Sequence, residues 1–363
     1  MKKRIRQNII LLAATVIIFI LFLEIGFRII SLFSLNFMCA TYSNPSEAYL
    51  CKLESQLSKS LEKYNQTTGI TAQDVCDSWD PQLGWIPKAN CKTPKYSTNS
   101  KGIRGTKEYS LQKNKKRIAV IGDSFTWGVN NFDNETYPFY LDKLFNGKAD
   151  VMNMGVEGYG SDQFYIYFTR DGLKYNPDIV IFGLFLPDIH RVIFSVRDYF
   201  KPRFIIKNKE LVEDPDAKIP DIKTALKMSS EIKKKNRSYL LSYVGGLYNK
   251  FIRRATSYRG ELPITLKIIE DMNKKLKGKN TELIVLLIPE QEMVEKNNFD
   301  YYGVIPQITS NLNENKIEYI NLQPVFKKEF DSRKESLYQG HLKPIGNFII
   351  ARELFKYINK SGD

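Results

Sequence analysis

The sequence predicts an α/β protein with a doubly wound parallel sheet, preceded by a transmembrane helix. Short apolar runs alternate with stretches of helical periodicity, the order expected when crossover helices cover both faces of a parallel sheet. The run from Ile179 to Leu186 is apolar throughout, as in a strand that is buried on both faces. A longer apolar run begins at Ile9 and has the length of a membrane span.

The N-terminal apolar run, residues 9–33, is expected to be an uncleaved membrane anchor. Residues 9–23 contain nothing more polar than Thr15, and only Glu24 and Arg28 interrupt the apolar character of the remainder. These two residues are one helical turn apart and can pair near the far interface. A signal peptide is the alternative, but its apolar region is usually shorter and no small-residue cleavage pattern follows here. Residues 1–8 are basic and are expected to stay in the cytoplasm, which leaves the rest of the chain outside.

All four cysteines lie in residues 34–115, a lead-in between the anchor and the α/β domain. An even number of cysteines in an extracytoplasmic segment predicts two disulfides, with three possible connectivities. We prefer the local pairing, Cys39 with Cys51 and Cys76 with Cys91. The cysteines lack C-x-x-C spacing and histidine partners, so we expect no metal site, and we expect no cofactor.

The α/β domain is expected to cover residues 116–363, a size that buries a substantial core. Its strands are predicted at residues 118–121, 151–154, 179–186, 282–288 and 317–320. Right-handed crossovers bring the loops that follow these strands to one edge of the sheet. An insertion at about residues 190–262 breaks the alternation and opens with a hairpin around Asn208. This insertion is a lid, a substrate wall or a surface elaboration, and the sequence leaves these open.

A serine directly follows the first predicted strand, in the tripeptide Gly122-Asp123-Ser124. An α/β sheet places nucleophiles at such a turn, where the following helix offers backbone N–H groups to negative charge. A serine nucleophile needs a base, and the chain contains only two histidines. His341 precedes the C-terminal helix and can reach a strand end, whereas His190 opens the polar insertion. We therefore prefer His341 as the base.

Three segments resemble motif blocks of the SGNH/GDSL hydrolases, in particular their membrane-anchored bacterial members. They are Gly122-Asp123-Ser124, residues 153–163 and residues 340–346, in the family's order. The resemblance implies a flavodoxin-like sheet with Ser124 as nucleophile and His341 as base. It also implies that the backbone N–H groups of Ser124 and Gly155 bind the oxyanion.

Two family side chains are missing. The resemblance leads us to expect an asparagine where Pro187 stands, and proline offers neither an amide side chain nor an N–H. An aspartate is expected shortly before the base, where this chain has Gln339. Gln339 could orient the imidazole through its carbonyl oxygen, but it cannot stabilise an imidazolium by charge. A carboxylate elsewhere could serve instead, and the candidates are Asp188, Asp331 and Glu335.

The resemblance implies a serine ester hydrolase or O-acyltransferase that acts on acyl esters such as acetyl esters, of envelope or secreted polysaccharide. A catalytically degenerate glycan-binding or scaffold protein on the same fold is the alternative, and a lipid-directed esterase is a third reading. The implied location is the bacterial inner membrane, with one span and a periplasmic domain. Envelope-polysaccharide assembly proteins are candidate partners.

The net charge of +14 raises the question of nucleic-acid binding. Its basic runs match no nucleic-acid motif, and the domain is expected outside the cytoplasm. We therefore expect no nucleic-acid partner and interpret these lysines as solvated surface.

Overall fold

The computed structural model describes residues 2–42, 44, 46–53, 76–234, 237–256, 260–296 and 303–360. The chain forms two compact units, each built from several segments of the sequence. The first comprises Met1–Glu62, Val196–Tyr199 and Pro220–Thr256. The second comprises Lys63–Ser195, Phe200–Ile219 and Ser257–Asp363.

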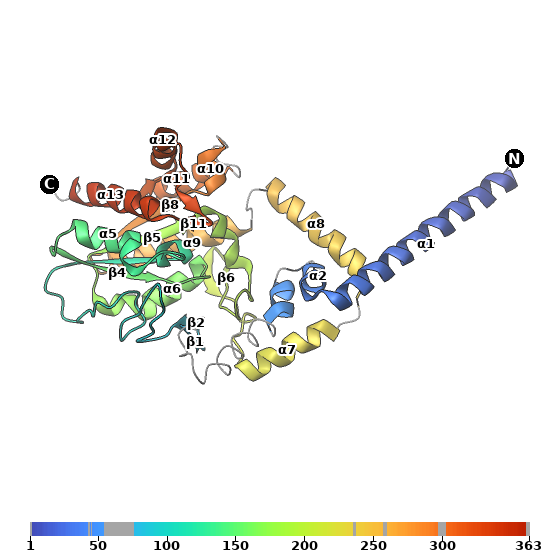
Figure 1. The fold of residues 1–363 in the computed structure, drawn as a ribbon, viewed down its shortest axis with the longest axis horizontal. Helices are drawn as coiled ribbons and strands as arrows, with labels where there is room; N and C mark the ends of the chain where they lie inside the picture. Colours follow the sequence, from blue (N-terminus) through green and yellow to red (C-terminus); the bar gives the residue numbers. More distant parts are fainter. Residues whose placement is uncertain are drawn as a thin grey trace. The chain divides into compact units, whose positions relative to one another are not determined.

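The second unit is built on a parallel sheet of five strands (Figure 1). The strands are β3 (Lys116–Gly122), β4 (Ala149–Gly155), β5 (Ile179–Phe185), β8 (Glu282–Ile288) and β9 (Glu318–Asn321). Their order across the sheet is β4-β3-β5-β8-β9, and every neighbouring pair is parallel. Numbered within the sheet, this is the flavodoxin order 2-1-3-4-5. The predicted fold class is therefore confirmed, and β3 ends at the point where the strand order reverses.

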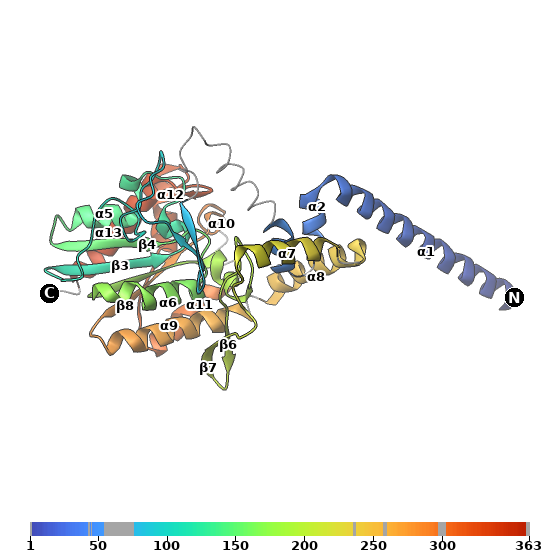
Figure 2. The same ribbon diagram turned by 90° about the horizontal axis from the view of Figure 1, so that it is seen from below.

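Helices cover both faces of this sheet, as Figure 2 shows. Helices α5, α12 and α13 pack on one face over the buried side chains of β3, β5 and β8, and α6, α9 and α11 lie on the other. Their bounds are α5 (Tyr137–Leu144), α6 (Ser161–Arg170), α9 (Glu261–Lys277), α11 (Val304–Glu314), α12 (Gln323–Arg333) and α13 (Pro344–Lys360). Thr136 caps the start of α5 by accepting the Phe139 N–H.

The remaining elements of the second unit are short. They are β1 (Asp77–Asp80), β2 (Gly84–Pro87), α4 (Ser124–Trp127), η1 (Asp133–Glu135), η2 (Gly172–Tyr175), η3 (Leu186–Ile193), β6 (Phe204–Lys207), β7 (Glu210–Glu213), α10 (Gln291–Glu295), β10 (Tyr338–Gln339) and β11 (His341–Leu342). The hairpin expected in the insertion is β6 and β7, and it turns at Asn208 and Lys209, both with positive φ. Such a two-residue turn matches the twist of the flanking strands.

The first unit contains α1 (Lys2–Phe33), α2 (Leu35–Ala40), α7 (Ile222–Lys234) and α8 (Tyr239–Thr256). Residues 46–53 are also helical. Residues 220–256, which the sequence places in the predicted insertion, thus group with the N-terminal helices. A small core forms around Cys39, Tyr42 and Cys51, against which Ile232 packs.

Helix α1 is long and apolar enough to cross a bilayer, with a mean hydropathy of 2.8 over the best window of Arg4–Phe33 and none of that window buried. It is the one helix with these properties in the part of the chain that the structure describes. A signal sequence near the N-terminus meets the same criteria. Whether α1 stays in the membrane therefore remains a prediction.

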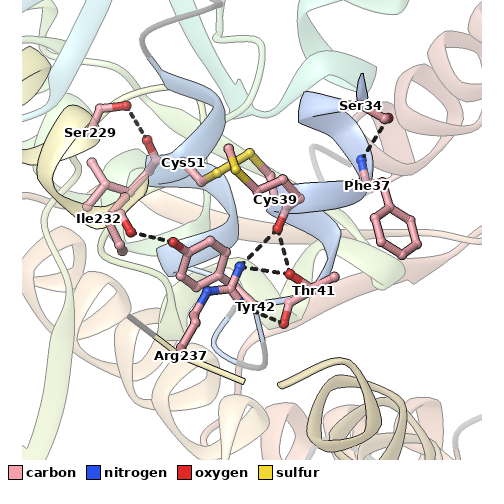
Figure 3. Close-up of a disulfide and its surroundings, with 11 residues drawn as sticks. Ser34, Phe37, Cys39, Thr41, Tyr42, Cys51, Ser229, Ile232 and Arg237 are labelled. Atoms are coloured by element: carbon pink, nitrogen blue, oxygen red, sulfur yellow. Dashed lines mark hydrogen bonds between the residues drawn. A yellow bond between two sulfur atoms is a disulfide. The ribbon is translucent and has the colours of Figure 1, made fainter. Parts of the chain in front are cut away.

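Both expected disulfides are present with the local pairing. Cys39 is joined to Cys51 in the first unit (Figure 3), and Cys76 is joined to Cys91 in the second. No free cysteine is found among the described residues. The lead-in predicted at residues 34–115 thus contributes one disulfide to each unit.

Candidate functional site

Ser124 is the first residue of α4, at the carboxyl end of β3. Asp123 precedes it in an extended conformation and caps the helix, since its Oδ1 accepts the Phe125 N–H at 2.8 Å. Gly122 makes the turn possible because a Cβ there would lie 2.0 Å from Thr126 Oγ1. The Ser124 residue is 5% exposed. Local sequence thus holds the hydroxyl at the point where the strand order reverses.

His341 lies in the tight hairpin of β10 and β11, in which Gln339 pairs with His341 around Gly340. Gly340 has a φ of +74°, a conformation that glycine adopts without strain. The hairpin directs the imidazole toward α4, and Nε2 lies 3.0 Å from Ser124 Oγ. The imidazole also lies against the Phe125 ring, with 5.0 Å between ring centroids. The structure therefore brings together the two residues proposed as nucleophile and base.

Buried asparagines join the segment around and after His341 to the segment that follows α4. Asn131, which is 3% exposed, donates from Nδ2 to the Leu342 carbonyl at 2.9 Å. The fully buried Asn347 accepts the Tyr137 N–H at 3.1 Å through Oδ1. The two residues that bond are 210 or more positions apart in each case. Sequence analysis missed both asparagines, because nothing in their local pattern distinguishes them from turn or helix residues.

Arg104 holds the other end of α4. Its guanidinium is buried and donates to the carbonyls of Trp127 (2.5 Å), Gly128 (3.1 Å) and Asn131 (2.8 Å). It also pairs with Asp133 at 3.1 Å. Carbonyls at a helix end have no intrahelical partner, so a cation placed there satisfies them and balances their partial negative charge. This arginine therefore fixes the short helix that carries Ser124.

The electrostatic environment favours a neutral imidazole. Burial lowers the pKa of His341 below its usual value of 6.5, the carboxylate of Asp123 acts in the opposite direction, and the nearby charge of Arg191 lowers it further. A neutral imidazole can accept the hydroxyl proton of Ser124, whereas an imidazolium cannot. His341 is therefore in the protonation state of a base at neutral pH.

Asp123 has a second buried oxygen besides the one that caps α4. The residue is fully buried, and Oδ2 has no hydrogen-bond partner among the residues that the structure describes. A buried carboxylate oxygen without a donor strongly favours nearby positive charge. Sequence analysis treated Asp123 only as part of the Gly-Asp-Ser tripeptide.

Arg191 lies in η3 and is held by buried contacts. Its guanidinium pairs with Asp188 at 2.6 Å and donates to the Tyr159 carbonyl at 2.9 Å. Behind it, the fully buried Lys201 pairs with Asp162 at the start of α6 and donates to the Arg191 carbonyl at 3.3 Å. These contacts hold the Arg191 charge near His341.

Gly155, one of the two proposed oxyanion donors, lies at the end of β4. The Gly155 N–H donates to Asn153 Oδ1 at 3.1 Å. A Cβ on Gly155 would lie 2.4 Å from the Trp127 nitrogen and 2.7 Å from the Thr126 carbonyl carbon. Gly155 is thus required for the close packing of β4 against α4, and its service as an oxyanion donor stays a prediction.

Within the described ranges, no hydrogen bond or ion pair joins the His341 imidazole to the side chain of a residue suggested to orient it. Gln339 is exposed, and no hydrogen bond joins its side chain to the imidazole there. Asp188 pairs with Arg191, Asp331 with Lys327 at 2.6 Å, and Glu335 with Lys343 at 2.9 Å. Each of these three candidate carboxylates is thus paired with a cation, and none is hydrogen-bonded to His341.

The second histidine is occupied elsewhere. His190 Nδ1 lies against the Pro187 carbonyl, to which it donates, and its ring packs edge-on against Phe194. In the described part of the chain, no group of three or more His, Cys, Asp or Glu side chains is arranged to hold a metal ion.

Comparisons with known proteins give only distant likenesses. A protein described as lipolytic, of the G-D-S-L family, from Desulfitobacterium hafniense is 14% identical over 67% of this chain and 99% of its own, with a TM-score of 0.40. A catalytic mutant of an acetylxylan esterase from Geobacillus stearothermophilus is 13% identical over 68% of this chain and 95% of its own, with a TM-score of 0.40. An α/β hydrolase enzyme from the metagenome of Lake Arreo is 13% identical over 68% and 96%, with a TM-score of 0.41. No family model and no curated protein matches the chain.

Proposed function

We propose that this protein is a membrane-anchored serine ester hydrolase or O-acyltransferase. The observation that carries the proposal is the distance of 3.0 Å between His341 Nε2 and Ser124 Oγ. A serine hydroxyl is a weak nucleophile at neutral pH unless a base within hydrogen-bond reach takes its proton. The depressed pKa of His341 keeps that base unprotonated.

The geometry supports a two-step acyl transfer. His341 Nε2 takes the proton as Ser124 Oγ adds to the acyl carbonyl, and the tetrahedral oxyanion is assigned to the N–H groups of Ser124 and Gly155. Collapse of this intermediate breaks the ester bond, and the imidazolium returns the proton to the leaving alcohol. Water or a second hydroxyl then gives its proton to His341 and attacks the acyl carbonyl of the acyl-enzyme. Collapse of this second intermediate breaks the bond to Ser124 Oγ, the imidazolium returns the proton to Ser124 Oγ, and the acid or the new ester is released.

The motif resemblance supports the substrate class. It favours acyl esters, acetyl esters among them, on envelope or secreted polysaccharide as substrate. Retention of α1 in the bacterial inner membrane would hold the two disulfides and the site on the periplasmic side, where disulfides persist. Polysaccharide-assembly proteins of the envelope would then be the neighbours of this site.

A glycan-binding or scaffold protein is the second candidate, and one observation favours it. No hydrogen bond to His341 Nδ1 is found among the described residues, whereas a triad base is normally held by a carboxylate. Loss of that acid costs about 10⁴ in turnover when the wrong tautomer results. Loss of one oxyanion donor costs on the order of 10²–10³ more.

A fluorophosphonate probe separates the two candidates. The wild-type protein should be labelled, Ser124→Ala should abolish labelling and His341→Ala should reduce it strongly. Ser310→Ala, an exposed serine of α11, is the matched control and should label normally. His190→Ala should label normally as well. Folded wild-type protein that is not labelled and does not release acetate from p-nitrophenyl acetate would favour the binding protein.

A further inference from the structure

The two charged residues inside the apolar segment of α1 both contact α8. The Glu24 carboxylate accepts the N–H groups of Tyr239 (3.1 Å) and Leu240 (2.9 Å), and the Ser238 hydroxyl (2.9 Å). The N–H groups of Tyr239 and Leu240 are the first two of α8, and N–H groups at a helix start have no partner within their own helix. A carboxylate of the proposed membrane span thus caps the start of a second helix.

Arg28 completes the same contact. It pairs with Glu24 at 2.9 Å, as its position one turn away predicts, and it donates to the Arg237 carbonyl at 2.8 Å. Its guanidinium also lies over the Tyr239 ring, 5.3 Å from the centroid. Charged groups in an apolar span usually mark a specific partner, and here the partner is the start of α8.

The segment before α8 is fixed to the disulfide region, as Figure 3 shows. The Arg237 guanidinium donates to the carbonyls of Thr41 and Met38 at 3.0 Å each and lies 3.5 Å from the Tyr42 ring centroid. Met38 and Thr41 flank Cys39, which is bonded to Cys51. The start of α8 is therefore held by α1 on one side and, on the other, by the segment around Cys39 that follows α1.

One face of α8 packs on α1 and α2, and another face is exposed. Tyr243 lies against Phe27 and Phe37, with ring centroids 5.3 Å and 6.4 Å away. The uncovered residues recur at helical spacing and form an apolar stripe: Leu241 (71% exposed), Val244 (52%), Leu247 (52%) and Tyr248 (63%). Four large apolar side chains on one helix face are more than the scattered exposed residues of an ordinary surface.

The level of Glu24 along α1 indicates what covers this stripe. Glu24 lies 15 residues after Ile9, or about 22 Å along the helix at 1.5 Å per residue. A hydrocarbon core of about 30 Å that begins at Ile9 therefore ends near Ile29, about 7 Å beyond Glu24, which places the start of α8 at the boundary between acyl chains and headgroups. Ile25 and Ile29 of α1 are 55% and 50% exposed, so the apolar surface of α1 continues at this level.

We propose that α8 is a second membrane-contacting element, whose apolar stripe lies in the outer interfacial layer of a phospholipid bilayer. The proposal rests on the proposed retention of α1 in the membrane. A helix with one polar and one apolar face binds at this boundary, with the apolar side chains toward the acyl chains. The cap by Glu24 fixes where α8 begins.

Site-directed spin labelling tests the proposal in the full-length protein, reconstituted in liposomes of phosphatidylethanolamine and phosphatidylglycerol. The four native cysteines are paired, so a single introduced cysteine takes the label. Leu241→Cys and Val244→Cys probe the stripe. Lys227→Cys is the water-facing control, because the Lys227 side chain on α7 is 77% exposed. Ile18→Cys reports on α1 itself. Tyr248→Cys replaces either stripe variant that fails to fold.

The measured quantity is the ratio of collision rates with oxygen, which partitions into lipid, and with a water-soluble nickel chelate. The stripe labels should give a ratio several-fold above that of Lys227→Cys, close to that of Ile18→Cys. If Ile18→Cys reports lipid and the stripe labels behave like Lys227→Cys, α8 faces water and only this inference fails. If Ile18→Cys also reports water, the anchor fails and the inference fails with it. Stripe labels shielded from both reagents would indicate a protein partner or a second copy and would overturn lipid contact.

Discussion

Gly155 lies so close to the backbone of Trp127 that an added Cβ would be 2.4 Å from the Trp127 nitrogen. This contact joins the end of β4 to the last residue of α4, the short helix whose first residue is Ser124. Backbone atoms cannot yield as a flexible side chain can, so a larger residue at 155 must displace α4. The position of the proposed nucleophile therefore depends on a glycine in the neighbouring strand.

Gly155→Ala should lower both stability and activity. Overpacking of a buried site lowers the free energy of unfolding by about 1–3 kcal/mol. Displacement of Ser124 should lower kcat and change KM less. Thermal unfolding and ester hydrolysis measure the two effects. Gly278→Ala is the matched control, since the nearest atom to its Cβ would be 3.5 Å away, and it should change neither quantity. Full activity in Gly155→Ala would show that α4 tolerates the displacement.

The sequence predicted the sheet well because four of its five strands, β3, β4, β5 and β8, are almost wholly buried. The edge strand β9 is only partly buried. Mostly apolar runs located all five strands, and the structure shifts their ends by only a few residues. β5 ends at Phe185, one residue before the predicted end, and Pro187, which has no N–H for a strand ladder, follows in η3. Ser124 and His341 could be paired because a strand-to-helix turn and a choice of two histidines left few alternatives.

The supporting residues could not be predicted in the same way. Asn131 and Arg104 donate hydrogen bonds to backbone carbonyls that are remote in sequence, and neither residue belongs to a periodic pattern. The grouping of α7 and α8 with the N-terminal helices likewise depends on long-range contacts such as that between Glu24 and Tyr239. Such contacts appear only after the chain has folded, so local pattern carries no signal for them.

Asn131→Ala should loosen the hairpin that carries His341. The variant removes the donor to the Leu342 carbonyl and leaves that buried oxygen with a poorer partner, which costs about 1–3 kcal/mol. We expect a lower unfolding midpoint in urea and a several-fold lower kcat. Asn313→Ala, an exposed residue of α11, serves as the control and should behave like the wild type. Unchanged kcat in a destabilised Asn131→Ala would assign this asparagine to stability alone.

The disulfide pairing should be found in protein isolated from its native compartment. Peptide mapping without reduction should recover Cys39 linked to Cys51 and Cys76 linked to Cys91. Replacing Cys39 and Cys51 by serine should leave the other bond intact and destabilise the first unit by about 3 kcal/mol, the value for a loop of this length. Recovery of crossed pairs, or of four alkylated thiols, would contradict the assignment.

The pH dependence of activity should report His341. A base must be unprotonated, so kcat/KM should rise with pH through the pKa of the imidazole and fall below it. Since burial and Arg191 lower that pKa, the inflection should lie below 6.5, and activity should persist into mildly acidic solution. Initial rates between pH 4.5 and 8 on a non-ionisable ester measure it. An inflection above 6.5 would indicate that another charge dominates or that His341 is not the base.

Asp123→Asn tests whether the carboxylate before the nucleophile supports the base. Asparagine caps helices as well as aspartate does, so α4 should keep its N-terminal hydrogen bond to Phe125. The negative charge is lost, and with it the one effect that raises the pKa of His341. The inflection in kcat/KM should therefore move to lower pH.

The same variant should also lower kcat. The imidazolium that forms during acyl transfer would lose the favourable charge of Asp123. The loss of about 1.4 kcal/mol of this stabilisation would correspond to a tenfold lower rate. Asp221→Asn is the matched control, because Asp221 accepts the Thr224 N–H at the start of α7 and is exposed. If Asp123→Asn moves neither the inflection nor kcat, the residue only caps α4 and the base works without a carboxylate. If both move as expected, Asp123 supplies from the nucleophile's own turn the charge that the position of Gln339 lacks.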